Sequence, residues 1–409
     1  MKILQINALN RTGSTGRICF ELEHHINGME GWQCFTAYSE GEARPGNYRI
    51  GGRYGKMLHA LFSRMTGMVA HFSRWSTKAL LRQIDIIEPD IVHLHNLHSN
   101  YVHFPMLMRY LATNRIPVAL TLHDSWFYTG KCGYYVDVDC DRWRKGCGSC
   151  PHLKRYIPSW IFDRTGRMLR EKRQLFADIY RLGVVGVSDW VAGEAKQSLL
   201  GEAAILHRIH NWVDTERFRP AGADAVAGLR SKLGIEDRFA ILCVASIWIE
   251  EKGLGEVLRL APRLDPGTCV VLVGDLPVSA RALPENVISA GSTDSEDELA
   301  VYYSMADVFL TLSRMETFGL VSAEALAGGT PVICYDVTAC PEVVEEGCGF
   351  TVPVDGDGEA VLQSIRRTKA IGKKHFSEKC RASALRKFQM QARMDDYMLF
   401  YKVLATGKA

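Results

Sequence analysis

The chain has 409 residues, of which 47% are hydrophobic and 23% are charged. This composition excludes a disordered chain, and the length exceeds what one ordinary hydrophobic core supports, so we expect two or three domains. The formal net charge of +3 is too small to indicate nucleic acid as a partner. No apolar run approaches the roughly 20 residues that span a bilayer, and the first run is too short for a signal peptide. We therefore expect a cytosolic protein.

In chain order, apolar runs that predict buried strands alternate with segments that have helical spacing. The strands are predicted at 3–9, 34–38, 91–94, 118–122 and 184–187, and then at 240–245, 269–273, 287–290, 308–312 and 331–334. The helices are predicted at 17–26, 167–182, 255–264, 296–305 and 319–327. Such alternation is typical of parallel sheets that are covered by helices on both faces.

The alternation restarts after residue 211, and the segment 211–224 has the composition of a linker. We therefore predict an α/β protein with two doubly wound, Rossmann-like domains, at 1–210 and 211–375, that face a central cleft. Ligands of such sheets bind at the carboxyl ends of the strands. A last stretch with helical spacing, 376–409, follows the second domain and could pack back on the first.

The segment between Glu42 and Asp85 contains no acidic residue, although eight arginine and lysine residues fall there. Its apolar residues keep helical spacing at Leu58, Leu61, Phe62, Met65, Met68, Val69 and Phe72. Two interpretations are open. A basic amphipathic helix is typical of an element that lies on an anionic membrane surface. The same pattern also suits a helix that faces the core and has a solvated basic rim.

Two carboxylates, Glu316 and Glu324, bracket the start of the helix predicted at 319–327. The first free N–H groups of this helix, at Phe318, Gly319 and Leu320, form a ready anion site. With a diphosphate on those amides, Glu316 is placed to accept from sugar hydroxyls and Glu324 to reach a ribose diol. The spacing therefore indicates a nucleotide-sugar site. The structural alternative is an ordinary strand–loop–helix with two solvated glutamates.

The sequence ETFGLVSAEALAGGTPVI at 316–333 resembles the E-x7-E motif of the retaining family 4 glycosyltransferases, which have the GT-B fold. The resemblance extends over nearly the whole chain and includes NRTGSTGR at 10–17, PDIVHLH at 89–95, GVS at 186–188, NWVD at 211–214 and EEKG at 250–253. A narrower resemblance is to the colanic acid and capsule branch, which builds bacterial exopolysaccharide. It is carried by TLHDSW at 121–126, TGKC at 129–132 and WRKGCGSCP at 143–151.

The resemblance implies that Lys252, Glu316 and His123 are catalytic. Lys252 neutralises the donor diphosphate as it leaves, Glu316 holds the donor hexose, and His123 faces the reacting sugar. The donor-binding residues that it implies are Gly13, Gly16, Lys252, Glu316, Phe318, Gly319, Leu320 and Glu324. Members of this family need no metal, because a lysine and helix amides replace the cation, so we expect no cofactor for catalysis.

The chain departs from the family pattern at one position. The family usually has an arginine five residues before the lysine, and here Ile247 occupies that place. Either Arg17 or another cation substitutes for the arginine, or Lys252 acts alone.

Four of the twelve cysteines fall in one loop, 131–151, as Cys132, Cys140, Cys147 and Cys150. Their spacing, C-x7-C-x6-C-x2-C, can supply the four thiolates of a closed, structural zinc site. His152 is a spare ligand candidate. The alternatives are four reduced cysteines, or disulfides that form on handling.

Three other functions are open. The tripeptides DVD at 137–139 and DCD at 139–141 match a motif that binds a metal diphosphate in a different glycosyltransferase fold. His93, His95 and His98, with His123 and Asp124, could form a metal-dependent hydrolase, although core histidines with protein partners are commoner. A nucleotide-sugar epimerase can have the same two-domain fold.

We therefore predict transfer of a hexose, with retention, from a UDP or GDP sugar to a lipid-linked oligosaccharide in exopolysaccharide, capsule or O-antigen synthesis. Such an acceptor would bring the cytosolic enzyme to the surface of the inner membrane. The sequence identifies neither the base, the sugar and the acceptor nor the oligomeric state.

Overall fold

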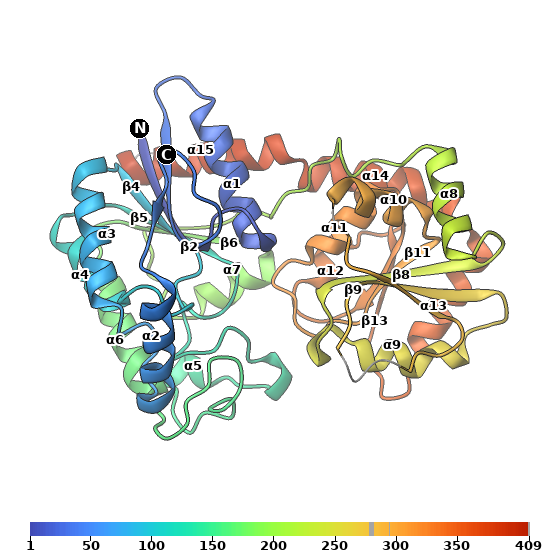
Figure 1. The fold of residues 1–409 in the computed structure, drawn as a ribbon, viewed down its shortest axis with the longest axis horizontal. Helices are drawn as coiled ribbons and strands as arrows, with labels where there is room; N and C mark the ends of the chain where they lie inside the picture. The colour runs from blue at the N-terminus through green and yellow to red at the C-terminus, as the bar shows by residue number, and fades with distance from the viewer. Residues whose placement is uncertain (278–281, 294, 408–409) are drawn as a thin grey trace. The chain divides into compact units, whose positions relative to one another are not determined.

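The structure is a computed structural model that describes residues 1–277, 282–293 and 295–407. It divides into two compact domains (Figure 1). The first domain comprises Met1–Ile209 together with Met394–Ala409, and the second comprises His210–Arg393. Each has a parallel sheet at its centre, so the α/β class and the two Rossmann-like domains are confirmed.

The first domain is built on a parallel sheet whose seven described strands have the order β3-β2-β1-β4-β5-β6-β7. The strands are β1 (Lys2–Leu9), β2 (Gln33–Glu40), β3 (Tyr48–Arg49), β4 (Ile91–Leu94), β5 (Val118–Leu122), β6 (Leu182–Gly186) and β7 (Ile205–Arg208). Ile3 pairs with Cys34 on one side and with Ile91 on the other. The strand order therefore reverses at β1 and β4, and their carboxyl ends form the switch point at which such sheets bind ligands.

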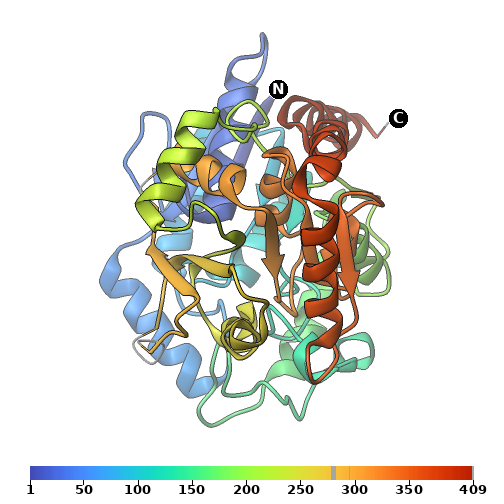
Figure 2. The ribbon, with the colours of Figure 1, turned by 90° about the vertical axis from the view of Figure 1, so that its right-hand side faces the viewer.

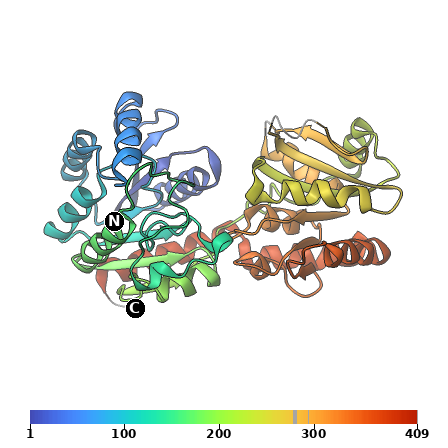
Figure 3. The same cartoon turned by 90° about the horizontal axis from the view of Figure 1, so that it is seen from below.

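Helices cover both faces of this sheet, as Figure 3 shows. They are α1 (Gly13–Asn27), α2 (Arg53–Thr66), α3 (Arg74–Ile87), α4 (Phe104–Thr113), α5 (Arg142–Lys145), α6 (Thr165–Ala177), α7 (Asp189–Lys196) and the greater part of α15 (Met390–Thr406). The cysteine-rich loop 131–151 contains α5 and a short 3₁₀ turn, η1 (Val136–Val138).

The second domain has a parallel sheet of six described strands in the order β10-β9-β8-β11-β12-β13, whose arrows are drawn in yellow to orange in Figure 2. The strands are β8 (Phe239–Ile247), β9 (Thr268–Asp275), β10 (Val287–Gly291), β11 (Val308–Thr311), β12 (Val332–Tyr335) and β13 (Gly349–Val352). The helices are α8 (Ala223–Leu233), α9 (Leu254–Leu260), α10 (Glu296–Met305), α11 (Leu320–Ala327), α12 (Cys340–Val343), α13 (Glu359–Ile371) and α14 (Lys373–Phe388), with 3₁₀ turns η2 (Glu250–Lys252) and η3 (Ala261–Arg263).

Every strand that the apolar runs predict is present, within a few residues at each end. The sequence pattern missed β3, β7 and β13, all of which lie at or near sheet edges. Their residues are largely half-buried or exposed, so they lack the continuous apolar run that identified the central strands.

The stretch with helical spacing at 376–409 is two helices and not one. Helix α14 ends at Phe388, Gln389 is extended with φ −60° and ψ 128°, and α15 follows. Phe376, Cys380 and Phe388 of α14 are buried, and α14 belongs to the second domain, which ends at Arg393 and not at residue 375. Only the part of the stretch from Met394 onward belongs to the first domain.

The helical spacing from Leu58 to Phe72 is likewise interrupted. Helix α2 ends at Thr66, and Gly67 follows it with φ 72°. The large apolar side chains of α2 are 41–82% exposed, namely Tyr54, Met57, Leu58, Leu61, Phe62 and Met65, whereas His59 and Ser63 are buried. The interpretation of this helix as a core-facing element is therefore wrong, because α2 turns its polar face inward.

Candidate active site

The site predicted in the second domain is assembled from the loops that follow β8 and β11. Lys252, at the end of η2, donates from Nζ to Oε1 of Glu316 over 2.7 Å. The side chains of Lys252 and Glu316 are 38% and 16% exposed, so the pair is open to a ligand on one side. Residues that are 64 positions apart in the sequence thus meet at the carboxyl ends of neighbouring strands, as expected for a parallel sheet.

Gly253 fixes the position of Lys252. Its φ is 78°, which L side chains rarely adopt, and a Cβ atom there would lie 2.5 Å from the carbonyl oxygen of Leu312. The loop after β8 can therefore approach the end of β11 only with glycine at this position. Ser313 adds a hydroxyl that donates to the carbonyl oxygen of Glu251 over 3.4 Å.

Thr338 holds the backbone of Glu316 and was not identified from the sequence. Its Oγ1 accepts the N–H of Glu316 at 3.2 Å, and the N–H of Ala339 donates to the Glu316 carbonyl at 3.3 Å. Thr338 has φ 52°, an uncommon conformation for a β-branched residue. Strain of this kind is found where the surrounding structure fixes a functional group.

The helix whose N-terminus was expected to bind phosphate starts slightly later than predicted. Helix α11 begins at Leu320, with Gly319 as its N-cap at φ 92°. Gly319 has no side chain to cap the helix, so amides at this end are available to an anion. Phe318 is buried against the rings of His210 and Phe388, with centroid distances of 5.6 and 5.3 Å, and anchors the turn.

Glu324 lies deeper than the sequence indicates. It is only 3% exposed, and its Oε2 accepts the hydroxyl of Tyr303 at 2.9 Å. Contact between Glu324 and a ribose therefore stays a prediction.

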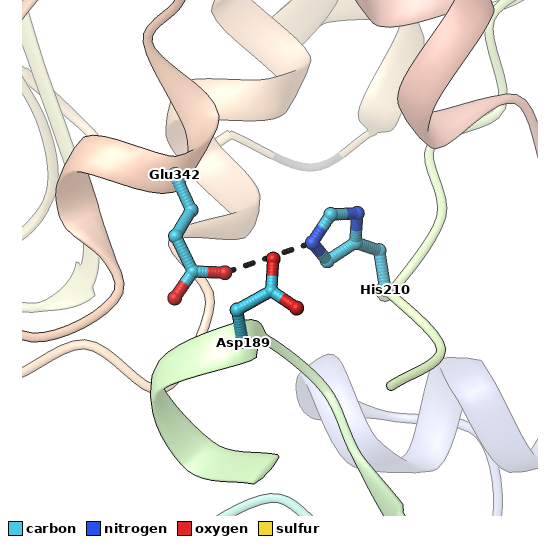
Figure 4. Close-up of side chains that lie close together, drawn as sticks. All are labelled: Asp189, His210 and Glu342. Carbon is cyan, nitrogen blue, oxygen red and sulfur yellow. Dashed lines mark ion pairs between the residues drawn. The ribbon is translucent and has the colours of Figure 1, made fainter. Parts of the chain in front are cut away.

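His210 belongs to the same part of the second domain. Its ring packs on Phe318, and its Nε2 lies 3.7 Å from Oε2 of Glu342 in α12 (Figure 4). Asp189, which is also drawn there, belongs to the first domain.

Ile247, at the position where the family has an arginine, is 63% exposed at the end of β8. The neighbouring cation Arg314 pairs with Glu256 at 3.1 Å. Substitution of the family arginine by Arg17 or another cation, or action of Lys252 alone, stays a prediction.

In the first domain, the glycine loop leads from β1 into α1. Gly13 is the first residue of α1 and has φ 67°. A Cβ atom on Gly16 would lie 3.0 Å from the backbone nitrogen of Arg11, so the loop is packed tightly on the helix. The first turn of α1 contains no acidic residue, which suits an anion at this end.

His123 follows β5 and is part of a buried chain of hydrogen bonds. Its Nε2 lies 3.0 Å from Nδ1 of His95, whose Nε2 lies 3.1 Å from Oε1 of Gln5. Burial lowers the pKa of His123 to about 4 and that of His95 well below its ordinary value. Both imidazoles are therefore neutral near pH 7.

The histidines proposed for a metal-dependent hydrolase already have protein partners. His93 bonds the hydroxyls of Tyr401 and Thr121 at 2.7 and 2.8 Å. His98 bonds Asp124 at 2.7 Å. Since the ring nitrogens of His93 and His95 are occupied, the structure favours core histidines over metal ligands.

A pocket of about 540 Å³ opens beside Asp124 and was not predicted. Its wall includes Lys56 and Arg64 from the inward face of α2, His98, and Tyr134 from the cysteine-rich loop. The N–H of Trp126 donates to Asp124 at 2.8 Å. Although burial opposes it, the contacts with His98 and with this N–H lower the pKa of Asp124. The wall of the pocket thus contains positively charged groups, Lys56 and Arg64, and a negatively charged one, Asp124.

The four cysteines of the loop 131–151 line one small cavity of about 20 Å³, as their spacing suggested. Cys132 and Cys150 share a hydrogen bond between their sulfur atoms. His152 does not line this cavity; its Nε2 lies 3.0 Å from Asp137.

Comparison with known proteins identifies the family. Residues 31–217 match the model of Glycosyltransferase Family 4, and residues 228–383 match that of Glycosyl transferases group 1. The chain belongs to this family of glycosyltransferases. A relative from Escherichia coli K12, WcaC, which is assigned to colanic acid biosynthesis as a glycosyl transferase, is 27% identical over 77% of each chain.

A second relative of this glycosyltransferase is a GDP-mannose-dependent α-(1-6)-phosphatidylinositol monomannoside mannosyltransferase from Mycolicibacterium smegmatis. It is 32% identical over 43% of this chain and 52% of its own length. Among solved structures, sucrose-phosphate synthase from Thermosynechococcus elongatus matches with a TM-score of 0.75 at 19% identity, over the whole of both chains. Anabaena HepE in complex with UDP-glucose matches with a TM-score of 0.68 at 16% identity, over 99% of this chain and 100% of its own. These likenesses confirm the GT-B fold.

Proposed function

We propose that this glycosyltransferase moves a hexose, with retention, from a nucleotide diphosphate sugar to a lipid-linked oligosaccharide in exopolysaccharide, capsule or O-antigen synthesis. The observation that supports it most is the Lys252–Glu316 pair beside the open N-terminus of α11. A cation, a hydroxyl acceptor and helix amides then lie together where a diphosphate sugar needs them.

In the reaction, the bond between the anomeric carbon and the diphosphate breaks, and both electrons leave with the diphosphate. Lys252 and the amides at the start of α11 neutralise that charge, so catalysis proceeds without a metal. Glu316 accepts from hexose hydroxyls and holds the sugar. The acceptor hydroxyl attacks on the face from which the diphosphate departs and gives its proton to the departing phosphate, which makes a separate general base unnecessary.

Two relatives bear on the donor. HepE was solved with UDP and with UDP-glucose, and the mycobacterial relative is named for GDP-mannose. We infer that this chain uses a UDP or GDP hexose.

The pocket beside Asp124 would receive the acceptor. Lys56 and Arg64 on its wall suit the phosphate groups that join an oligosaccharide to its lipid, and Asp124 and Tyr134 suit sugar hydroxyls. The name of WcaC supports an acceptor of the colanic acid type.

The outward face of α2 would bring the enzyme to the lipid. No helix in the described part of the chain is both long and apolar enough to cross a membrane. The exposed apolar side chains of α2 and its exposed basic residue Arg53 instead suit the surface of an anionic membrane. We therefore place the enzyme at the cytoplasmic surface of the inner membrane.

A donor screen tests this function. We expect one nucleotide sugar, among UDP and GDP hexoses, to raise the melting temperature of the purified protein. With that donor labelled in the sugar, we expect the label to move to lipid extracted from membranes of cells that make the polysaccharide. Release of free sugar would indicate a hydrolase and an altered nucleotide sugar would indicate an epimerase, and either result would contradict the proposal.

A further inference from the structure

The cysteine-rich loop 131–151 contains a cavity that the proposed reaction does not use. Cys132, Cys140, Cys147 and Cys150 all line it. Its volume of about 20 Å³ admits one water-sized occupant. The loop supports the pocket beside Asp124, because the N–H of Ser125 donates to the carbonyl of Gly133 at 2.9 Å and Tyr134 forms part of the pocket wall.

Two of the thiols already have the hydrogen bonds that support metal-bound thiolates. Cys147 accepts the N–H of Gly130, and Cys150 accepts the N–H of His152. Such donors to a ligand sulfur orient it and stabilise its negative charge. Cys147 also has φ 49°, and Gly148 and Ser149 after it have positive φ, so the C-x2-C segment makes a tight turn, and both of its thiols line the same cavity.

Two buried lysines, Lys131 and Lys172, lie in or beside this loop. Lys131 is 2% exposed and donates to the carbonyls of Leu153 and Ile157. Lys131 also lines the cavity with the four cysteines.

Lys172 is 4% exposed, and its Nζ lies 3.7 Å from the centroid of the Trp126 ring. Its Nζ donates to the carbonyl oxygens of Trp126 and Thr129. In the part of the chain that the structure describes, neither Lys131 nor Lys172 forms an ion pair with a carboxylate.

We propose that Cys132, Cys140, Cys147 and Cys150 bind one structural Zn²⁺ ion. Binding releases the thiol protons to water and forms four zinc–sulfur bonds, with no change in oxidation state. Four thiolates and one Zn²⁺ carry a net charge of −2, and Lys131 is the lysine that lines the same cavity.

Binding draws the sulfur atoms together. Among the described residues, no three of these sulfur atoms lie within 4.8 Å of one another, whereas four ligands at zinc–sulfur distances of about 2.3 Å are closer than that. Cys132 and Cys150 share a hydrogen bond, so their sulfur atoms are neighbours before the metal binds.

Elemental analysis of the full-length chain, purified without chelator, tests the proposal. We expect one zinc per chain in the wild type and background zinc in a Cys132→Ser/Cys150→Ser variant. A matched control is Cys348→Ser/Cys380→Ser, because Cys348 and Cys380 also share a hydrogen bond between sulfur atoms but belong to the second domain. This control should keep its zinc.

Two measurements keep the test valid if the serine variant does not fold. Wild-type protein in which Co²⁺ replaces the metal should show the absorption of a tetrahedral thiolate site. Alkylation of the native wild type should spare the four thiols until a chelator removes the metal. Wild-type protein without stoichiometric zinc, a Cys132→Ser/Cys150→Ser variant that keeps it, or a disulfide among the four cysteines in thiol-trapped cells would overturn the proposal.

Discussion

Lys252 and Glu316 form an ion pair in the structure. A donor that binds to them must therefore replace this ion pair with its own contacts. The pair is partly exposed, so its contribution to stability is small, about 1 kcal/mol or less. A diphosphate competes for the ammonium group of Lys252 and leaves the carboxylate of Glu316 free to accept from a sugar. Under the proposed function, the residues of the resting ion pair are the residues that receive the substrate.

Alanine at Lys252 or at Glu316 should lower turnover by about 100-fold or more, because each removes a charge that acts on the transition state. The fold should persist, since the ion pair contributes little to stability. Steady-state kinetics with the identified donor and far-ultraviolet circular dichroism measure the two effects. Lys232→Ala, which removes an exposed lysine of α8, is the control. Near-normal turnover in either variant would contradict the assigned roles.

Gly253 gives a sharper test of how the site is built. Gly253→Ala combines positive φ with a clash against the carbonyl of Leu312, so the free energy of unfolding should fall by about 2–3 kcal/mol. Gly255→Ala, two residues along in α9, meets nothing within 4 Å and should be neutral or stabilise by up to about 1 kcal/mol. Urea denaturation compares the two. Equal effects would mean that the close approach at Gly253 is unimportant.

The family resemblance predicted that Lys252 and Glu316 share one site, and their side chains do meet, because parallel strands bring the loops at their carboxyl ends to one edge. It could not predict the depth of Glu324, since helical spacing does not tell which face another helix covers; here Tyr303 of α10 covers it. Nor could it identify Thr338, whose role depends on a backbone conformation that no sequence pattern reveals.

Helix α2 has an inverted polarity. Its buried residues His59 and Ser63 are polar, and the apolar residues lie outside. The loop after the cysteines extends this surface, because the N–H of Trp160 donates to the carbonyl of Arg64, and Trp160, Ile161 and Phe162 are all exposed. Figure 1 shows α2 beside this loop.

Leu58→Glu/Phe62→Glu should abolish binding to vesicles that contain anionic lipid, because it places charge on the face that enters the interface. The free energy of unfolding should change by less than about 0.5 kcal/mol, since both side chains are exposed. Leu399→Glu, on the exposed side of α15 in the same domain, should leave binding intact. Flotation measures binding. Equal flotation of the double variant and the wild type would exclude α2 as the contact.

The alternation of apolar runs was sufficient to predict both sheets, but not the ends of the domains. The boundary in the C-terminal stretch depends on Gln389, an ordinary glutamine in an extended conformation between two helices. Neither proline nor glycine marks it. The orientation of α2 was open for a related reason: helical spacing shows that a face is apolar, but not whether protein covers it.

For the molecule as a whole, the described parts of both domains have sheets in which every pairing is parallel, and one helix, α15, completes the first domain from the far end of the chain. Tyr397 and Tyr401 of α15 bond Thr121 and His93 inside that domain. The stability of the first domain therefore depends on the last turns of the polypeptide, and its histidines make that stability sensitive to pH.

Acid should weaken the first domain well before its carboxylates titrate. Burial lowers the pKa of His93 to about 3 and that of His123 to about 4, from an ordinary value of 6.5. Between pH 6.5 and about 4 the unfolded chain binds protons that the folded domain does not, so the free energy of unfolding falls as the pH falls. Each such histidine contributes on the order of 3 kcal/mol across that window.

Urea denaturation at pH 7 and pH 5 measures this fall. His93→Gln should reduce it, whereas His207→Gln, which changes an exposed histidine of β7, should leave it unaltered. A free energy of unfolding that stays constant between the two pH values would show that the buried imidazoles do not control acid sensitivity.

The inverted helix α2 also has a consequence for anyone who purifies the protein. Away from any bilayer, its outward hydrocarbon and aromatic groups have only detergent, chromatography resin or one another to cover them. Recovery of the purified protein should then rise with the amount of mild detergent present at lysis.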